Sequence, residues 1–405
     1  MKRSKMTLLS KLSLGIFSWF ILSIVQASSP LWTFTPLTPT AIDILPTETA
    51  TIQYLVTNKS KKPHTLVMSP ITGISQLTST GNCPNPFTLN VHQSCTLTLE
   101  VTGSAMQKDV IDGPILCQNG AGALQCYRPS HGQKLQVIRK TDISITAPIQ
   151  ANRVINVGST TPLTITVTLN PNNLINDYNV QATLPVSWIN VVQDASNCAT
   201  IAPGESCTLK FTSTTPYEPD QITISGKNTK NLANTFLAFR QEGGLVFSVN
   251  SGVVKVSDEE NIDPTTLMWW NEVYNAPSMA TSLIDGAFNT PIIITAFGNP
   301  HNYAAALCAD SLVEGFNDWV LPAICELGRF TGSGTDAGCR SVNQNLYTTL
   351  QLNGFGNFDN SPYWSSTFSP TTNAWAQNFN PNDGTMFAGG VNNRRFVRCI
   401  RSFNF

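Results

Sequence analysis

Four arginines near the C-terminus could together bind an anion. Arg394, Arg395, Arg398 and Arg401 fall within eight positions that contain no acidic residue. The planar guanidinium group presents several N–H donors that match sulfate and carboxylate oxygens. We therefore treat Arg394 and Arg395 as candidate ligand contacts, with solvated surface charge as the alternative.

The charge around these arginines works against a long polyanion as the ligand. Residues 236–405 hold eight Lys and Arg against fourteen Asp and Glu, a net charge of −6. A sulfated polysaccharide would therefore bind only if the arginine patch is well separated from the acidic groups.

Tryptophan rings offer a second kind of ligand contact, stacking on sugars. If Trp269-Trp270 lies in a strand, the adjacent rings point to opposite faces, so one is buried and the other exposed. Trp364 lies in the segment Tyr363-Trp364-Ser365-Ser366. Trp270 and Trp364 are thus candidates for sugar stacking, and packing in the core is the alternative.

The cysteines indicate disulfides rather than a metal centre. All ten follow residue 27, no Cys-x-x-Cys pair occurs, and the four histidines are scattered. An even number of cysteines is typical of a disulfide framework in an exported protein. Three pairs of cysteines are close in sequence and separated by turn residues, which predicts three local disulfides, namely Cys83–Cys95, Cys117–Cys126 and Cys198–Cys207. The other four permit three pairings, namely among Cys308, Cys325, Cys339 and Cys399.

Catalytic motifs are absent from the sequence. It contains no Gly-x-Ser-x-Gly elbow, no His-Glu-x-x-His and no phosphate-binding loop. We therefore expect no catalytic residue, no metal and no cofactor.

The first 27 residues have the pattern of a secretory signal peptide. Lys2, Arg3, Lys5 and Lys11 precede an apolar stretch, residues 12–25, and a small residue, Ala27, precedes Ser28. An uncleaved membrane anchor is the alternative, although the stretch is shorter than the ~20 residues of a comfortable span. We expect a secreted or surface-exposed protein with no transmembrane segment after cleavage.

The composition argues against a nucleic-acid partner. Only 12% of residues are charged, and removing four basic residues with the signal leaves 20 Lys and Arg against 25 Asp and Glu. The resulting net charge of −5 lacks the clustered positive charge that phosphate backbones require.

An internal repeat organises the N-terminal half into two domains. The segments around Cys83–Cys95 and Cys198–Cys207 both contain Asn-Cys followed by Ser-Cys-Thr-Leu. Residues 163–169 alternate strictly between apolar residues and Thr, which predicts a half-buried strand. We predict two immunoglobulin-like β-sandwiches, residues 28–147 and 148–237.

Three motifs in order mark the last domain, residues 238–405. They are residues 317–327 (NDWVLPAICEL), 363–367 (YWSST) and 397–401 (VRCIR). This set resembles the C-terminal domain family of the Legionella collagen-like surface adhesin, whose domain has a C-type-lectin-like fold. The resemblance implies an α+β domain opening on a strand at residues 243–249, so the whole chain is expected to be multidomain and mostly β.

The same resemblance suggests roles for particular residues. By analogy, Cys308 pairs with Cys399, and Cys325 with Cys339. We expect the motif residues to be structural, with Trp319 in the core and Asp318 capping a turn rather than binding calcium. These motif residues are Asp318, Trp319, Pro322, Glu326, Ser365, Ser366, Arg398 and Arg401.

Two helices are expected in this domain. The first would have Asn299 as its N-cap, begin at Pro300 and stop at Gly315. The second would begin at Pro322, where the family usually has Thr or Ser in place of Ala323. Losing that cap should cost about 1 kcal/mol and leaves Glu326 without a reciprocal partner.

These observations predict a secreted or surface-exposed bacterial binding protein of the adhesin type. The last domain would recognise a glycan, possibly a sulfated one, or a host surface protein. One alternative is an envelope assembly protein that binds another bacterial protein. A formylglycine-generating type of oxidoreductase is a further alternative, on the ground of a related fold.

Overall fold

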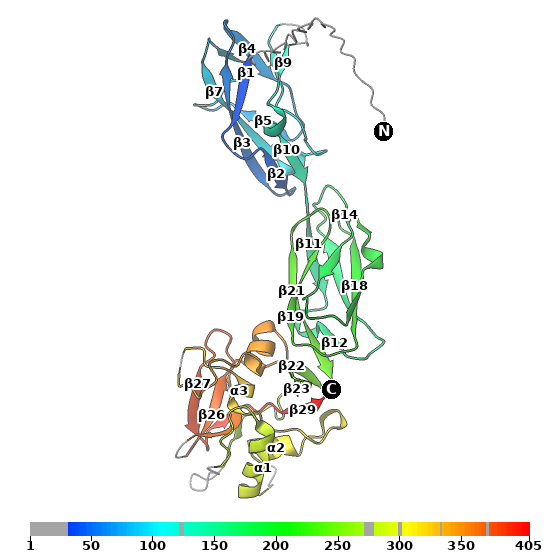
Figure 1. Ribbon diagram of the computed structural model, residues 1–405, viewed down its shortest axis with the longest axis vertical. Helices are drawn as coiled ribbons and strands as arrows, with labels where there is room; N and C mark the ends of the chain where they lie inside the picture. Colours follow the sequence, from blue (N-terminus) through cyan, green and yellow to red (C-terminus); the bar gives the residue numbers. More distant parts are fainter. Residues whose placement is uncertain (1–30, 121–124, 271–278, 299–301, 333, 370–371) are drawn as a thin grey trace, which may run out of the picture.

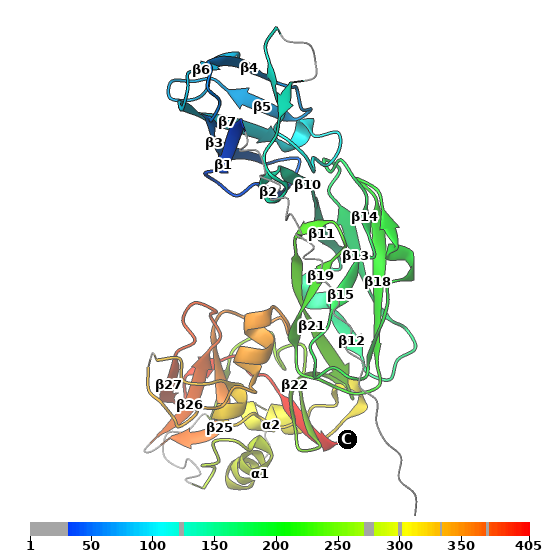
Figure 2. The same ribbon diagram turned by 45° about the horizontal axis from the view of Figure 1, so that its top comes forward.

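The computed structural model describes residues 31–120, 125–270, 279–298, 302–332, 334–369 and 372–405. The expected signal peptide, residues 1–27, lies outside the described residues. Three domains follow one another along an extended molecule, with two β-sandwiches leading to an α+β domain at the far end (Figures 1 and 2). We call the two sandwiches the stalk and residues 244–405 the head. No helix in the described part of the chain is long and apolar enough to cross a membrane.

The first sandwich packs two four-stranded sheets around an apolar core that includes Tyr54, Leu97 and Leu116. One sheet has the order β1 (Trp32–Pro36), β3 (Thr49–Asn58), β7 (Ser94–Thr102) and β5 (Ile74–Leu77). The other has the order β6 (Phe87–Leu89), β4 (His64–Met68), β8 (Leu116–Gln118) and β9 (Cys126–Tyr127). A parallel pair, β2 (Ala41–Ile44) and β10 (Gln136–Arg139), and two short turns, η1 (Gly103–Ala105) and η2 (His131–Gln133), complete the domain.

The second sandwich is built on strands that alternate as the sequence predicts. In β13 (Leu163–Leu169) the residues Ile165, Val167 and Leu169 are buried, while the threonines face outward. Its sheet has the order β16 (Val191–Asp194), β18 (Ser206–Ser213), β13, β11 (Thr141–Ala147) and β20 (Thr229–Asn231). Facing it lie β15 (Gln181–Thr183), β19 (Asp220–Ser225), β21 (Ala233–Gln241) and β12 (Val154–Asn156). The remaining elements are β14 (Asp177–Tyr178), β17 (Thr200–Ile201), η3 (Gln150–Asn152) and η4 (Ser196–Cys198).

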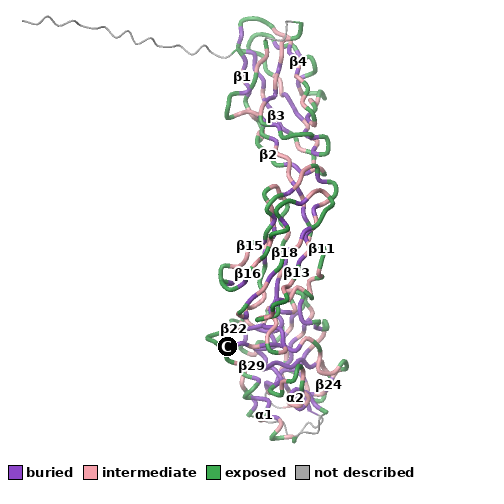
Figure 3. Tube along the Cα trace, turned by 90° about the vertical axis from the view of Figure 1, so that its right-hand side faces the viewer, coloured by how far each residue is buried: buried purple, intermediate pink, exposed green. Residues whose placement is uncertain are grey.

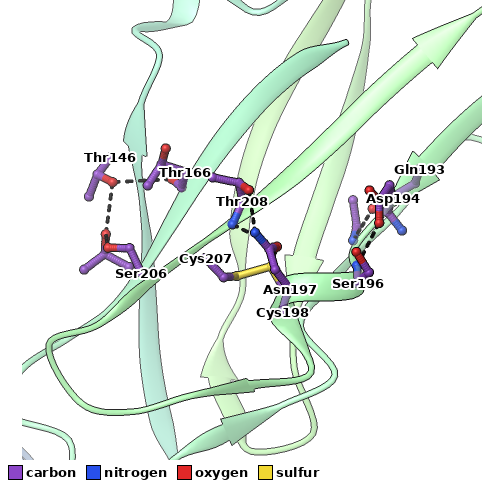
Figure 4. The surroundings of a disulfide bond; sticks show 12 residues. Thr146, Thr166, Gln193, Asp194, Ser196, Asn197, Cys198, Ser206, Cys207 and Thr208 are labelled. Atoms are coloured by element: carbon purple, nitrogen blue, oxygen red, sulfur yellow. Dashed lines mark hydrogen bonds between the residues drawn. A yellow bond between two sulfur atoms is a disulfide. The ribbon is translucent and has the colours of Figure 1, made fainter.

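The Cys198–Cys207 disulfide ties η4 to the start of β18 (Figure 4). Beside it, Asn197 Nδ2 donates a hydrogen bond of 2.8 Å to Thr208 Oγ1 on the outer face of the sheet. The staple therefore fastens the irregular segment before β17 to a central strand.

The domain boundaries differ from those predicted. Strand β11 pairs with β13, so the second sandwich begins near Thr141 rather than at residue 148. A boundary between residues 237 and 238 would cut through β21. Ile143 completes the core of the second sandwich, which is why the strand belongs there.

The second sandwich and the head share one sheet. Its order is β15, β19, β21, β22 (Gly244–Asn250), β23 (Val253–Ser257) and β29 (Ile400–Asn404), with β12 also paired to β21. Arg240 pairs with Leu245 across the tight turn between β21 and β22. A single apolar core includes Phe239 of the sandwich and Trp319 of the head. Buried stretches of the chain occur in both the second sandwich and the head (Figure 3). The head is thus fused to the stalk, whereas polar contacts such as Lys230 Nζ to Glu48 Oε2 (2.5 Å) join the two sandwiches.

The head adds a second sheet and short helices to this shared sheet. The second sheet consists of β25 (Pro362–Ser369), β26 (Asn373–Asn378) and β27 (Met386–Gly390), and a small ribbon pairs β24 (Leu267–Met268) with β28 (Arg394–Arg395). The helices are α1 (Gly286–Phe297), α2 (Ala304–Ala309) and α3 (Ile324–Leu327), and the other turns are η5 (Val313–Gly315), η6 (Leu346–Leu350) and η7 (Gln351–Asn353).

The helices only partly follow the prediction. The expected cap Asn299 and start Pro300 lie outside the described residues, and α2 itself covers only six residues. The helix ends before the predicted stop at Gly315, and Leu312, which follows it, is 71% exposed. Helix α1 was not predicted, although Asp285 is its N-cap and accepts a 3.0 Å bond from the amide of Phe288.

Candidate ligand-binding site

A hollow of about 350 Å³ with a mixed polar and apolar lining opens on the head beside β22 and β23. Its lining includes the apolar residues Val253, Ile284 and Val342, and Cys325, which is disulfide-bonded to Cys339. The polar side chains that line it are Ser248, Asn250, Ser251, Lys255, Glu326 and Gln344. Hydrogen-bond donors and acceptors together around a concave surface suit a polyhydroxylated ligand.

The position of the hollow follows from a hairpin in the sequence. Strands β22 and β23 are joined at Ser251-Gly252, and Asn250 and Ser251 are exposed at this turn. Gln344 reaches the same place from a distant segment, since its Oε1 accepts a 3.1 Å bond from Ser248 Oγ. These residues were not among the predicted site residues, although the polar turn Asn250-Ser251-Gly252 between two apolar runs predicts a hairpin.

Glu326 and Lys255 form the charged wall of the hollow. Glu326 Oε1 lies 2.5 Å from Lys255 Nζ, and Oε2 accepts 2.8 Å bonds from the amides of Gly286 and Ala323. Burial raises the pKa of Glu326, while Lys255 and the two amides oppose that shift. Lys255 also donates to the carbonyl of Ile284, which leaves one of its three N–H groups available to a ligand.

Ala323 stands where the family usually has a capping Thr or Ser, and other side chains bond the backbone amides at the start of α3 instead. Glu326 still bonds the Ala323 amide, so one half of a capping box is present although Ala323 has no side-chain acceptor. The amide of Ile324 instead donates to Thr367 Oγ1 at 3.0 Å, and Thr367 Oγ1 donates to the carbonyl of Ser282. The YWSST motif therefore supplies the polar partner for the start of α3.

The other motif residues of β25 are also interior groups. Ser365 Oγ donates to the carbonyl of Trp375 at 2.7 Å, and Ser366 Oγ bonds Asn289 Nδ2 at 3.2 Å. Both serines are buried. They connect strands β25 and β26 and helix α1 rather than contact solvent.

Asp318 and Arg401 form a bidentate pair at the edge of the shared sheet. Arg401 donates from Nε to Asp318 Oδ1 at 2.7 Å and from Nη2 to Oδ2 at 3.1 Å. The guanidinium also lies 3.8 Å from the ring centre of Phe316. Asp318 thus binds an arginine and does not cap a turn, whereas Trp319 is buried as expected.

Arg398 is fully buried and satisfied by backbone and amide oxygens. Its Nη1 donates to the carbonyls of Asp258 (2.9 Å) and Gly356 (2.6 Å), and its Nη2 donates to Asn261 Oδ1 (3.0 Å). Burial lowers the pKa of Arg398 and raises that of Asp258. Arg398 therefore fastens the segments before β24 and after η7 to the segment that leads into β29.

The two candidate ligand arginines have different surroundings. Arg395 lies between two rings, 4.6 Å from the centre of Trp364 and 4.6 Å from that of Phe387, and burial lowers its pKa. Arg394 is exposed, and its Nε donates to the carbonyl of Thr266 at 2.9 Å. Only Arg394 of this pair is positioned to meet a ligand in solution.

Neither candidate tryptophan is available for stacking on a sugar. Trp364 is buried and donates from Nε1 to the carbonyl of Leu267 at 3.0 Å. Trp270 is 9% exposed and stacks on Phe297 at 3.9 Å, while Trp269 is 1% exposed. The expected alternation fails because β24 ends at Met268, so the two tryptophans do not lie in a strand.

The comparisons with known proteins agree with the motif residues. The family model of the Lcl C-terminal domain matches residues 257–401. The head is an Lcl C-terminal domain. No curated protein matches the chain.

Some solved structures are similar to parts of the chain. They include a protein of unknown function from Porphyromonas gingivalis W83 (11% identity, 52% of this chain and 100% of that one, TM-score 0.22). Others are DIP-gamma IG1+IG2 (11%, 52% and 97%, 0.22) and a fimbrial protein from Bacteroides ovatus ATCC 8483 (11%, 85% and 94%, 0.26).

The cysteines of the chain are disulfide-bonded, in the Lcl C-terminal domain as in the stalk. All ten cysteines of the chain form disulfides, including Cys308–Cys399 and Cys325–Cys339 in the head. Within the described ranges, no group of three His, Cys, Asp or Glu side chains could hold a metal ion. The β-rich chain and its Lcl C-terminal domain support a protein of the surface-adhesin type.

Proposed function

We propose that this protein is an adhesin-type binding protein exposed at the cell surface. Its Lcl C-terminal domain recognises a glycan, and the two sandwiches hold that domain away from the surface. The observation that carries the proposal is an Lcl C-terminal domain fused through one continuous sheet to a stalk. The fusion transmits the orientation of the stalk to the head without a flexible joint.

The chemistry of the hollow favours an uncharged part of the glycan. Ser248, Asn250, Ser251 and Gln344 supply neutral donors and acceptors, and the charges of Lys255 and Glu326 offset each other. A sulfated group would instead need unpaired cations. Arg395 lies between two rings, Arg398 and Arg401 are buried, Arg340 pairs with Asp336, and Arg329 donates to Asn343. Arg394 is exposed and donates from Nε to the carbonyl of Thr266, so a sulfate could use its other N–H groups.

Catalysis forms no part of the proposal. The formylglycine-generating type of chemistry uses two reactive cysteines, and here every cysteine is held in a disulfide. Thiolates, not disulfide sulfurs, are the nucleophiles and metal ligands.

Binding of the chain from Ser28 onward to immobilised uncharged and sulfated glycans tests the proposal. The whole chain is needed because a head cut at residue 240 would lose its pairing with β21. We expect binding to at least one glycan, and about tenfold weaker binding when Asn250→Ala and Gln344→Ala remove two polar contacts.

On an uncharged glycan, Arg394→Gln is the control variant and should bind as the wild type does. Failure to bind any glycan, together with capture of a protein from envelope extracts, would overturn the proposal. That result would favour the assembly protein named in the sequence analysis.

A further inference from the structure

The free end of the first sandwich carries a rigid turn rich in lysine. This turn joins β3 to β4 and lies far from the head (Figure 1). Asn58 is fully buried, and its Nδ2 donates to the carbonyls of Lys62 (2.9 Å) and Leu89 (3.0 Å). Its Oδ1 accepts from the amide of Ser60 at 2.9 Å, and Ser60 Oγ bonds the Lys62 carbonyl. The backbone of the turn is thus fixed from within.

Three lysines point out of this fixed turn. Lys59, Lys61 and Lys62 are all exposed, and within the described ranges none has a carboxylate partner. Glu100, on the strand next to β3, stands opposite Thr51. Thr51 lies seven residues along β3 from the turn, so Glu100 is roughly 24 Å from the lysines at the usual rise per residue.

The other acids of this sandwich are already paired. Asp109 contacts Arg139, and Asp112 contacts Arg128 and Lys134. The remaining two lie at the opposite end of the sandwich, against the second domain, and these are Asp43 and Glu48. The positive charge of the lysine turn is therefore not compensated locally.

Apolar side chains are exposed at the same end. Leu31 is 51% exposed, and its carbonyl accepts from the amide of Lys59 at 2.9 Å. Val91 is 40% exposed and precedes His92, whose amide bonds the Asn58 carbonyl at 2.9 Å. We call the three lysines with Leu31 and Val91 the basic tip. A soluble polyanion would need only the cations, whereas a lipid surface accepts both the cations and the apolar side chains.

We propose that the basic tip docks on an anionic lipid surface. Each lysine adds electrostatic attraction to acidic headgroups, and Leu31 and Val91 enter the boundary between headgroups and acyl chains. The head carries a net charge of −6 over residues 236–405, while residues 31–139 hold seven Lys and Arg against five Asp and Glu. An anionic membrane therefore attracts one end of the molecule and repels the other. The stalk then stands on the membrane with the head directed outward.

Vesicle co-sedimentation of the chain from Ser28 onward tests this proposal. Starting at Ser28 removes the apolar stretch of residues 12–25, which could otherwise insert by itself. The vesicles are phosphatidylcholine alone or phosphatidylcholine with phosphatidylglycerol. We expect binding only to the anionic vesicles, with an affinity that falls as salt is added.

Two triple variants locate the contact. Lys59→Gln, Lys61→Gln and Lys62→Gln together should weaken binding on the order of 100-fold, since each lysine contributes about fivefold near an anionic membrane. The matched control removes the same charge elsewhere, at three lysines that are exposed and outside the tip, namely Lys108, Lys210 and Lys227. It should lose only a small part of the affinity, and Val91→Ser should weaken binding several-fold through its apolar surface.

Three results would overturn the proposal. One is equal binding to neutral and anionic vesicles, and another is an equal loss in both triple variants. The third is lysine-dependent retention on dextran sulfate beads without any vesicle binding, which would make the tip a site for soluble polyanions. Thermal unfolding of both variants checks that the fold is unchanged. None of these outcomes depends on whether the head binds a glycan.

Discussion

Removing the cation beside Glu326 should destabilise the head strongly and in a pH-dependent way. In Lys255→Met the Glu326 carboxylate keeps its bonds to the amides of Gly286 and Ala323 but loses the ammonium at 2.5 Å. Breaking a buried ion pair by removing one partner costs about 3–5 kcal/mol. Because the Lys255 side chain is 26% exposed, solvent screens part of that interaction, and we expect a loss of about 2–4 kcal/mol at pH 7.

The sign of the pH dependence follows from the pKa of Glu326. Burial already raises this pKa, and removing Lys255 takes away the charge that lowers it. An acid whose pKa is higher in the folded state stabilises the fold only at low pH, and the benefit is lost as the pH rises through the folded value. The variant should therefore approach the wild type near pH 4, below the usual pKa of glutamate, and diverge from it toward pH 7.

Urea unfolding followed by tryptophan fluorescence measures this effect. Five of the eight tryptophans lie in the head, so the signal reports mainly on that domain; they are Trp269, Trp270, Trp319, Trp364 and Trp375. Lys255→Arg, which keeps the charge, should recover most of the loss. A loss below about 1 kcal/mol, or one that is the same at pH 4 and pH 7, would refute the assigned role of the pair.

Three further predictions concern the residues that hold the head together. Arg398→Met should lower the free energy of unfolding by about 3–5 kcal/mol, because it leaves the carbonyls of Asp258 and Gly356 unsatisfied in the interior. Arg394→Met is the control and should change that free energy little. Urea unfolding midpoints measure both variants. Thr367→Val should cost about 1–3 kcal/mol in the same assay, since the amide of Ile324 and the carbonyl of Ser282 lose their partner. Replacing Cys308 and Cys399 by serine should lower stability by about 4–5 kcal/mol, because this disulfide closes a loop of 91 residues. Replacing Cys198 and Cys207 should cost about 2.5 kcal/mol, because their loop spans only 9 residues. Equal losses would contradict the chain-entropy argument.

Local patterns in the sequence were sufficient to predict the strands and the staples. The alternation of residues 163–169 matches β13, and the short cysteine spans match the three disulfides of the stalk. Both features depend on residues close in sequence, where turn geometry and side-chain period decide the outcome.

Features that depend on distant segments were not predictable in this way. Trp270 is buried because Phe297 of α1 stacks on it, and Arg395 is enclosed because Trp364 and Phe387 approach from two other strands. The hollow likewise joins a hairpin to Gln344, which lies in another part of the chain. Such contacts follow from tertiary packing, about which the spacing of one segment carries no information.

The fusion of stalk and head also escaped prediction for a physical reason. Strands β21 and β22 pair across a tight turn at Glu242-Gly243, where both residues have positive φ (44° and 82°). A hairpin inside a domain and a hairpin between two domains have the same local pattern. Only the shared core, which includes Phe239 and Trp319, shows that the two units are one body.

Calorimetric titration of a bound glycan against paired variants tests whether the hollow is the glycan site. The chain from Ser28 onward is titrated as wild type, as Asn250→Ala with Gln344→Ala, and as Arg394→Gln, at low and physiological salt. We expect about tenfold weaker binding in the double variant, no loss in Arg394→Gln and little effect of salt. Salt-sensitive binding that is lost in Arg394→Gln and kept in the double variant would contradict this expectation, because recognition would then lie on the arginine and not in the hollow.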